Sequence, residues 1–246
     1  ALILAAVPPA FALDSTRALS APGNALVAPF DARPGMVSFL VVSSVADQKL
    51  STHWAFWSDS CTHLAAVSIC LTPEDTVVVA PTKVQAIGED NVPVGPTVTA
   101  AAGHAGFITV TAYATNEACD DALRTGQVLV DDALVGTVTI ADTATTASFG
   151  ASPLVLGLDA TGSFTDLPDV LVQEVDVGTF APGDLAAATV YAFALEEHAG
   201  DFAGEVGAIT GTVSASAAYY DNLEIRTSLP DLEFGCAVTL DLLKFL

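Results

Sequence analysis

Residues 105–114 read AGFITVTAYA, and this stretch decides the fold class. In an extended chain successive side chains point to opposite faces. Phe107, Thr109, Thr111 and Tyr113 therefore share one face, and the other face carries Ile108, Val110 and Ala112. Both sets are rich in the β-branched and aromatic residues that strands favour. The stretch predicts a strand that has neighbours on both faces.

Similar segments recur along the chain, separated by Gly, Pro, Asn and Asp. They are MVSFLVVSSVA (36–46), STHWAFWS (51–58), DTVVVA (75–80), PTVTAAA (96–102), GQVLV (126–130), ALVGTVTIA (133–141), SPLVLGLD (152–159), DVLVQEVDV (169–177) and GAITGTVSASAAYY (207–220). Short strands with few interposed helices are typical of sandwiches and barrels. We expect an all-β fold, a sandwich or jelly-roll-like body of about 8–11 strands.

Two segments predict short helices. Residues 72–76 (TPEDT) place Pro73 at a first helical position after a Thr72 cap, which predicts a single turn. Residues 182–198 (PGDLAAATVYAFALEEH) are rich in alanine and leucine and have Asp184 as a cap, which favours a helix. The same apolar residues are also compatible with a pair of strands.

The N-terminal part differs from the rest. Residues 19–35 contain three prolines and two glycines and read as an extended connector. The expected layout is an apolar arm with its connector over 1–35, followed by a single β-rich body over 36–246. Residues 1–12 also resemble the end of a secretory signal peptide, with Ala10-Phe11-Ala12 as a small-x-small cleavage site.

If the first thirteen residues belong to the mature protein, they must pack on something, since they carry no charge. Two prolines exclude an uninterrupted helix but allow an extended arm. Such an arm can add a strand to the sheet of another subunit. The residues expected to make this contact are Leu2, Ile3, Leu4, Val7, Phe11 and Leu13.

Composition limits the partners. The 246 residues include 29 acids against 7 bases, a net charge of −22, while 52% of the residues are apolar and only 15% are charged. Nucleic acid and anionic lipid repel such a chain. No apolar run reaches the roughly 18 residues that a membrane helix needs, so no membrane span is expected. Subunit interfaces are where we expect the excess apolar surface to be buried.

The four cysteines are Cys61, Cys70, Cys119 and Cys236. An even number in a chain that begins like a secreted one suggests two disulfides and an extracellular or cell-surface location. Three pairings are open. The proximity of Cys61 and Cys70 in sequence favours that pair together with Cys119 and Cys236. Four buried free thiols are the alternative.

The densest cluster of chemically capable side chains is STHWAFWSDSCTHL (51–64). The candidate ligand surface is formed by His53, Trp54, Trp57 and His63, with the tryptophans stacking on a sugar. A Ser–His–Asp set and a two-histidine metal site are further interpretations, although a triad requires a spatial arrangement that sequence proximity does not provide. The structural alternative is a core strand that is apolar on both faces.

Motifs for nucleotide, zinc, haem or nucleophilic-serine chemistry are absent from the sequence, so we expect no enzyme and no cofactor. Calcium is the one ion that the acidic pairs suggest, with Asp120, Asp121, Asp131 and Asp132 as candidate ligands because they flank one expected strand. None of these aspartates lies in the spaced loop of an EF-hand.

The expected function is that of a secreted structural subunit. It would form an extracellular filament, sheath or surface layer, with copies of itself as head-to-tail partners through N-terminal strand exchange. A monomeric secreted module that binds glycans or adheres to surfaces is the alternative, followed by a secreted hydrolase with dispersed catalytic residues.

Overall fold

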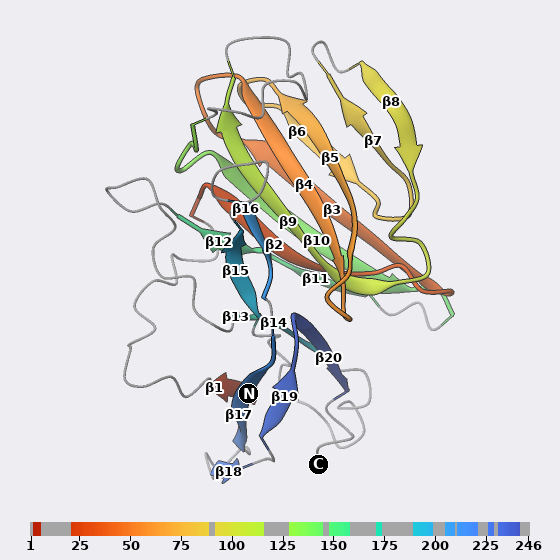
Figure 1. Cartoon of the computed structure of the whole chain (residues 1–246), viewed down its shortest axis with the longest axis vertical. Helices are drawn as coiled ribbons and strands as arrows, with labels where there is room; N and C mark the ends of the chain where they lie inside the picture. The colour runs from red at the N-terminus through yellow and green to blue at the C-terminus, as the bar shows by residue number, and fades with distance from the viewer. Residues whose placement is uncertain are drawn as a thin grey trace.

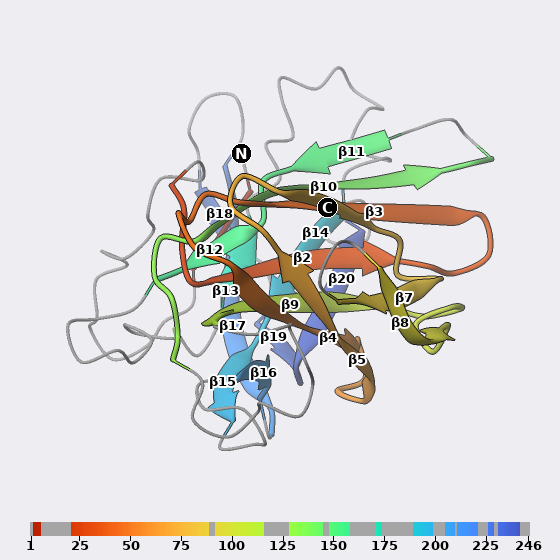
Figure 2. The same ribbon diagram turned by 90° about the horizontal axis from the view of Figure 1, so that it is seen from above.

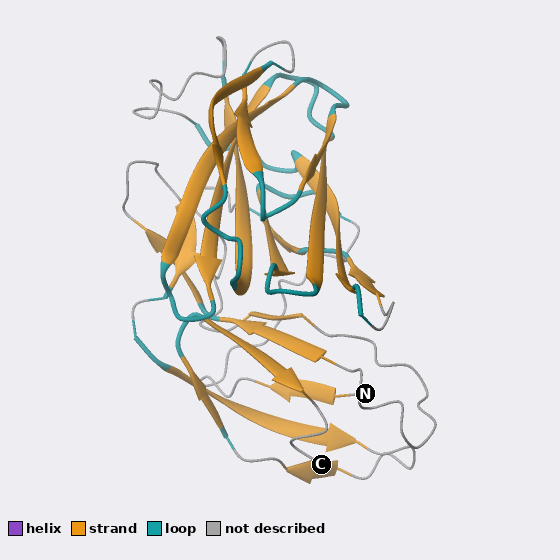
Figure 3. Cartoon of the chain, turned by 90° about the vertical axis from the view of Figure 1, so that its right-hand side faces the viewer, coloured by secondary structure: helices purple, strands orange, loops and turns teal. Residues whose placement is uncertain are grey.

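The computed structural model describes residues 2–5, 21–88, 92–115, 128–144, 148–157, 171–173, 189–198, 205–209, 211–220, 226–228 and 231–241. Within these ranges the chain forms strands β1 to β20 and no helix, which confirms the all-β prediction (Figure 3).

Two sheets lie face to face and form a sandwich (Figures 1 and 2). The outer sheet has the order β11-β10-β3-β6, with β3 (Met36–Ser44), β6 (Thr76–Val79), β10 (Leu134–Asp142) and β11 (Ser148–Ala151). The central sheet has the order β12-β2-β9-β4-β5-β7-β8. Its strands are β2 (Ala25–Asp31), β4 (Leu50–Ser58), β5 (His63–Leu71), β7 (Val84–Ile87), β8 (Pro93–Val98), β9 (Ala105–Ala114) and β12 (Leu154–Leu156).

The core lies between these two sheets. Alternate residues of β4 and β9 point toward the outer sheet. Trp54, which is paired across the strands with Val110, lies at the centre of the core and has no exposed surface. Leu40 of β3 and Val138 of β10 are opposite each other in the outer sheet and are also buried. Burial of such aliphatic and aromatic side chains is the dominant stabilising term of the fold.

The other face of the central sheet is also covered. Val206 and Ala208 of β16 (Glu205–Ala208) are buried where this strand contacts β4 and β9. The Phe193 ring of β14 (Thr189–Phe193) lies 5.5 Å from that of Phe107 on β9. This double burial explains why β9 is apolar on both faces.

Apart from β16 and the strand paired with it, which lie over the central sheet, the remaining strands lie at one end of the sandwich (Figure 1). A three-stranded sheet joins β13 (Leu171–Gln173), β14 and β20 (Ala237–Asp241), and β15 (Leu195–His198) pairs with β16. β17 (Val213–Tyr220) pairs with β18 (Arg226–Ser228), β19 (Leu232–Phe234) and β1 (Leu2–Ala5).

Neither predicted helix forms within the described residues, and at 189–198 strands are present, the alternative that the sequence left open. Over 182–198, strands β14 and β15 replace the helix from Thr189 onward. Their pairing with β20 and β16 outweighs the intrinsic preference of these residues for a helix, which is less than about 1 kcal/mol per residue. Residues 182–188 lie outside the described part. At 72–76 the chain makes a tight turn, in which the Asp75 N–H donates to the Thr72 carbonyl at 3.1 Å and Glu74 has a φ of 61°. This φ stops helical winding.

The expected connector over 19–35 also requires correction. Residues 25–31 within it form strand β2, every residue of which is buried, and β2 lies between β12 and β9 in the order of the central sheet. The observed strands β5 and β7 are missing from the sequence-based prediction. Of the expected strand 126–130, the described residues retain only an isolated bridge between Leu129 and Tyr113. Strand β2 therefore belongs to the sandwich, whereas the expected layout assigns its residues to the connector over 1–35.

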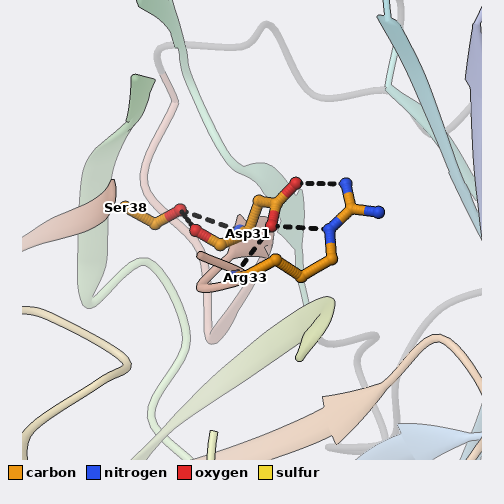
Figure 4. Close-up of polar contacts among 3 residues, drawn as sticks. All are labelled: Asp31, Arg33 and Ser38. Atoms are coloured by element: carbon orange, nitrogen blue, oxygen red, sulfur yellow. Dashed lines mark hydrogen bonds and ion pairs between the residues drawn. The ribbon is translucent and has the colours of Figure 1, made fainter. Parts of the chain in front are cut away.

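A small polar network fixes the corner at which the chain passes from β2 to β3 (Figure 4). Asp31 is buried and accepts hydrogen bonds from the backbone N–H of Arg33 at 3.1 Å and from its Nε at 2.9 Å. Ser38 Oγ accepts from the Asp31 N–H and donates to the Asp31 carbonyl, both at 2.8 Å. Every polar group named here has a partner, so the corner can be buried at little cost.

Candidate assembly surfaces

Strand β4 carries most of the candidate ligand residues, but it divides them between two faces. Trp54 points into the sandwich core, where its Nε1 donates to Thr52 Oγ1 at 2.8 Å. His53 points to the opposite face, is 5% exposed, and pairs across the strands with Thr111 and Ser68. Neither side chain is accessible to a ligand, so the four-residue surface expected from the sequence is not formed.

Trp57 and His63 do lie together, on the face of the central sheet opposite to the core. Their ring centroids are 4.9 Å apart, and Trp57 also stacks on Phe107 at 6.4 Å with an interplanar angle of 12°. Trp57 is half-buried and His63 is exposed. The cluster is thus chiefly a packing contact that leads into the apolar layer beneath the C-terminal strands.

The serines of this region have local structural roles. Ser58 is buried, lies 2.8 Å from Ser60 between their Oγ atoms, and accepts from the Thr62 N–H at 3.1 Å. These bonds hold the turn from β4 to β5 and do not join Ser58 to a histidine.

The disulfide pairing favoured by the sequence is wrong. Cys61, in the turn between β4 and β5, is bonded to Cys236, which lies between β19 and β20. Cys70 is disulfide-bonded as well, and Cys119 lies outside the described residues. Proximity in sequence misled the prediction because the chain brings its C-terminal part back over the central sheet. Disulfides persist in oxidising compartments, with which an extracellular location is compatible.

The acidic pairs do not form a recognisable metal site in the described part of the chain. Asp131 and Asp132 occupy the turn before β10, where Asp132 has a φ of 50°. Asp120 and Asp121 lie outside the described residues. Among the residues that are described, no group of three or more His, Cys, Asp or Glu side chains is placed to hold a metal ion.

The most unusual surface is the exposed face of the outer sheet, which we call the outer face. It consists of the residues that alternate with the core residues and that pair with one another across the strands: Val37, Phe39, Val41, Ser43, Thr76, Val78, Val135, Thr137, Thr139, Ala141, Ser148 and Gly150. None is charged. Phe39 is 42% exposed and Val78 is 61% exposed. Exposed apolar patches of this kind mark interaction sites.

A groove of about 340 Å³ opens on the same face. Its floor and walls come from β3 and β10, through Val41, Ser43, Val135, Gly136 and Thr137, and from the neighbouring chain at Ala21, Ser152, Pro153 and Val155. Among the residues that the structure describes, no carboxylate, ammonium or guanidinium group lines it. The groove is therefore suited to an uncharged side chain.

A second candidate surface is the edge at which β1 is added to β17. The two strands are antiparallel, and the register places Leu2 opposite Tyr219, Ile3 opposite Ala218, Leu4 opposite Ala217 and Ala5 opposite Ser216. Three of the six predicted arm residues thus belong to a strand, and Val7, Phe11 and Leu13 lie outside the described part. The arm pairs with its own chain in this structure.

The end of the central sheet at β8 is unsuited to strand addition. This strand contains Pro93 and Pro96, and Gly95 between them has a φ of 73°. Prolines lack the N–H that a further strand would need, and they are characteristic of protected edges. The outer face and the β17 edge therefore remain the better candidates for contacts between copies.

The sequence-based prediction missed the outer face. The relevant signal was the complete lack of charged residues in both 36–46 and 133–141, which leaves neither face of these strands charged. Comparisons with family models, curated proteins and solved structures produced no match to this chain. In the described part of the chain we find no helix with the length and apolarity that a membrane crossing requires.

Proposed function

We propose that this chain is a secreted structural subunit that assembles into an extracellular filament, sheath or surface layer by exchanging strand β1 between copies. The observation that carries the proposal is the antiparallel pairing of β1 with β17. A strand that completes its own sheet can complete the same sheet of a neighbouring copy with identical backbone hydrogen bonds.

Chain length supports the exchange. Residues 6–20 join β1 to Ala21, where the described sandwich begins. Fifteen residues span at most about 50 Å, which is enough to reach a neighbouring subunit. Because the arm and its acceptor edge are different surfaces, repeated exchange produces a head-to-tail chain of subunits.

The disulfide between Cys61 and Cys236 supports an oxidising, extracellular setting. A disulfide also suits a durable structural protein, since it limits unfolding of the chain. A glycan-binding module is less well supported, because Trp54 is buried and only Trp57 and His63 remain near the surface.

Negative-stain electron microscopy of the secreted full-length protein tests the proposal. We expect regular filaments or sheets, and intact mass measurement should show that residues 1–12 are retained. The double variant Ile3→Pro/Leu4→Pro should abolish them, because in a strand pair one of two consecutive N–H groups faces the partner. The matched variant Ile3→Val/Leu4→Val should assemble normally. Uniform 25.0 kDa particles, or removal of residues 1–12 on secretion, would refute strand exchange.

A further inference from the structure

The outer face stands out electrostatically from the rest of the molecule. The chain carries a net charge of −22, so two copies repel each other over most of their surfaces. Across the outer face this repulsion is weakest, since none of its twelve residues is charged. Phe39 and Val78 are also exposed there and gain by being covered.

We propose that a second copy of this chain packs on the outer face. The two copies are related by a two-fold axis that lies between the two outer sheets, parallel to their planes and perpendicular to the strands. Phe39 of each copy then enters the groove of the other. This contact is separate from the exchange of β1 and does not require it.

The position of the groove relative to Phe39 supports this arrangement. Leu40 is the middle residue of β3, with Phe39 on one side and Val41 on the other. A two-fold axis at the level of Leu40 therefore places Phe39 of one copy over the level of Val41 of its partner. Val41 and its cross-strand neighbour Thr137 line the groove. One axis thus satisfies both Phe39 side chains at once, as an isologous interface requires.

The charges beside the outer face select the direction of the axis. The acids at the end where β6 and β10 begin are Asp47, Glu74, Asp75, Asp131 and Asp132. An axis parallel to the strands would place the acidic end of one molecule over the acidic end of the other. The perpendicular axis instead separates the two acidic ends by about 30 Å, the length of nine strand residues, which is several times the Debye length of about 8 Å.

The opposite end of the outer sheet is the corner between β2 and β3. It presents Arg33, whose side chain is 53% exposed while it is ion-paired with the buried Asp31, and also Asp142, the last residue of β10, which lies opposite Met36. The perpendicular axis brings the acidic end of the partner toward this mixed end, where the attraction to Arg33 is partly offset by Asp142, and away from the acidic end of the first copy. Rim charges of this kind fix orientation more than they add affinity.

The area of the outer face is large enough for a dimer interface of modest affinity. Nine-residue strands are about 30 Å long and neighbouring strands are about 4.8 Å apart, so the pair of copies would bury on the order of 1,000 Å² in total. This is close to the lower limit for a specific interface. Face-to-face packing of two sheets is a standard arrangement, with the layers about 10 Å apart.

Sedimentation velocity of the full-length chain over a range of concentrations tests the proposal. The variant Ile3→Pro/Leu4→Pro removes the contribution of strand exchange, so we expect monomers and dimers of that variant. Adding Phe39→Glu or Val78→Glu should weaken dimerisation at least about tenfold, since each places a charge in the contact. Val94→Glu adds the same charge to the exposed edge strand β8 and should leave dimerisation unchanged.

Circular dichroism and thermal melting should show that the Phe39 and Val78 variants remain folded, because both side chains are exposed. Absence of dimers at every concentration overturns the proposal, as does an equal effect of all three glutamates. If filaments depend on β1 but this dimer is absent, the proposed function stands and only the outer-face contact fails. The reverse outcome, a dimer without filaments, refutes strand exchange and leaves this contact intact.

Cross-linking of introduced cysteines with a short bis-maleimide tests the direction of the axis. Val41→Cys lies next to the axis and should cross-link to the same cysteine of the other copy. Thr76→Cys lies at the level of Ser43, about 20 Å from its equivalent by the rise of a strand, and should not. Efficient cross-linking at Thr76→Cys but not at Val41→Cys would refute the perpendicular axis.

Discussion

Cys61 and Cys236 are bonded to each other across 175 residues of sequence. Cys61 lies in the turn that leaves the central strand β4, whereas Cys236 lies between the C-terminal strands β19 and β20. The Cys236 N–H also lies 2.9 Å from the Cys61 Sγ. The bond therefore attaches the C-terminal strands to the sandwich.

Removal of this disulfide should destabilise the protein strongly. Closing a loop of this length restricts the unfolded chain, so Cys61→Ser/Cys236→Ser should lower the free energy of unfolding by about 2–5 kcal/mol. Urea unfolding, followed by tryptophan fluorescence, measures the change. Addition of reductant to the double variant provides a control that isolates the contribution of the remaining disulfide. Unchanged unfolding midpoints with and without the two substitutions would contradict this structural role.

Trp54 and Trp57 should differ in their contribution to stability. Trp54 is fully buried between the sheets, so Trp54→Ala should cost about 3–5 kcal/mol through lost burial and the cavity left behind. Trp57 is half-buried beside His63, and its replacement by alanine should cost markedly less. Chemical denaturation of both variants gives the comparison. Equal losses would show that the sandwich core is not centred on Trp54.

These results show which parts of the fold were predictable from sequence. The alternation in 105–114 correctly identified β9, because a period of two reflects the pleat of the strand itself. Strand β2 was missed because Pro29 and the Pro and Gly residues before it resemble a connector. Pro29 is tolerated because β12 pairs only with Ala25 to Val27, so none of the described strands pairs with that side of β2 at Pro29.

The candidate surface was less predictable than the fold. Strand β3 is apolar on both faces, and its alternation does not reveal which face the central sheet covers. That choice depends on the path of the chain from β2 to β3, which lies beyond local pattern. The exposed Phe39 could therefore be recognised only once the two layers were placed. The same limit applies to β14 and β15, whose alanine-rich sequence favours a helix until their partners β20 and β16 are known.

The corner between β2 and β3 should be sensitive to loss of its carboxylate. Asp31→Ala leaves the Arg33 backbone N–H and guanidinium without their acceptor in a partly buried site. We expect a loss of about 1–3 kcal/mol, the cost of leaving such donors unsatisfied. Asp142→Ala is the matched control, since that carboxylate lies at an exposed turn, where it accepts a hydrogen bond from the Ala144 N–H at 2.8 Å. A similar effect of both substitutions on the urea midpoint would argue against a special role for Asp31.

Salt should strengthen association between copies of this chain. At low ionic strength the net charge of −22 opposes every contact between copies, and added salt screens this repulsion while leaving the burial of Phe39 and Val78 largely unaffected. Sedimentation velocity between about 0.01 and 1 M sodium chloride should therefore show a rising fraction of assembled protein as the Debye length falls from about 30 to 3 Å. The Phe39→Glu variant should show a smaller rise, because it keeps a charge within the contact itself. Dissociation by salt would instead indicate that ion pairs hold the copies together, which is incompatible with an uncharged interface.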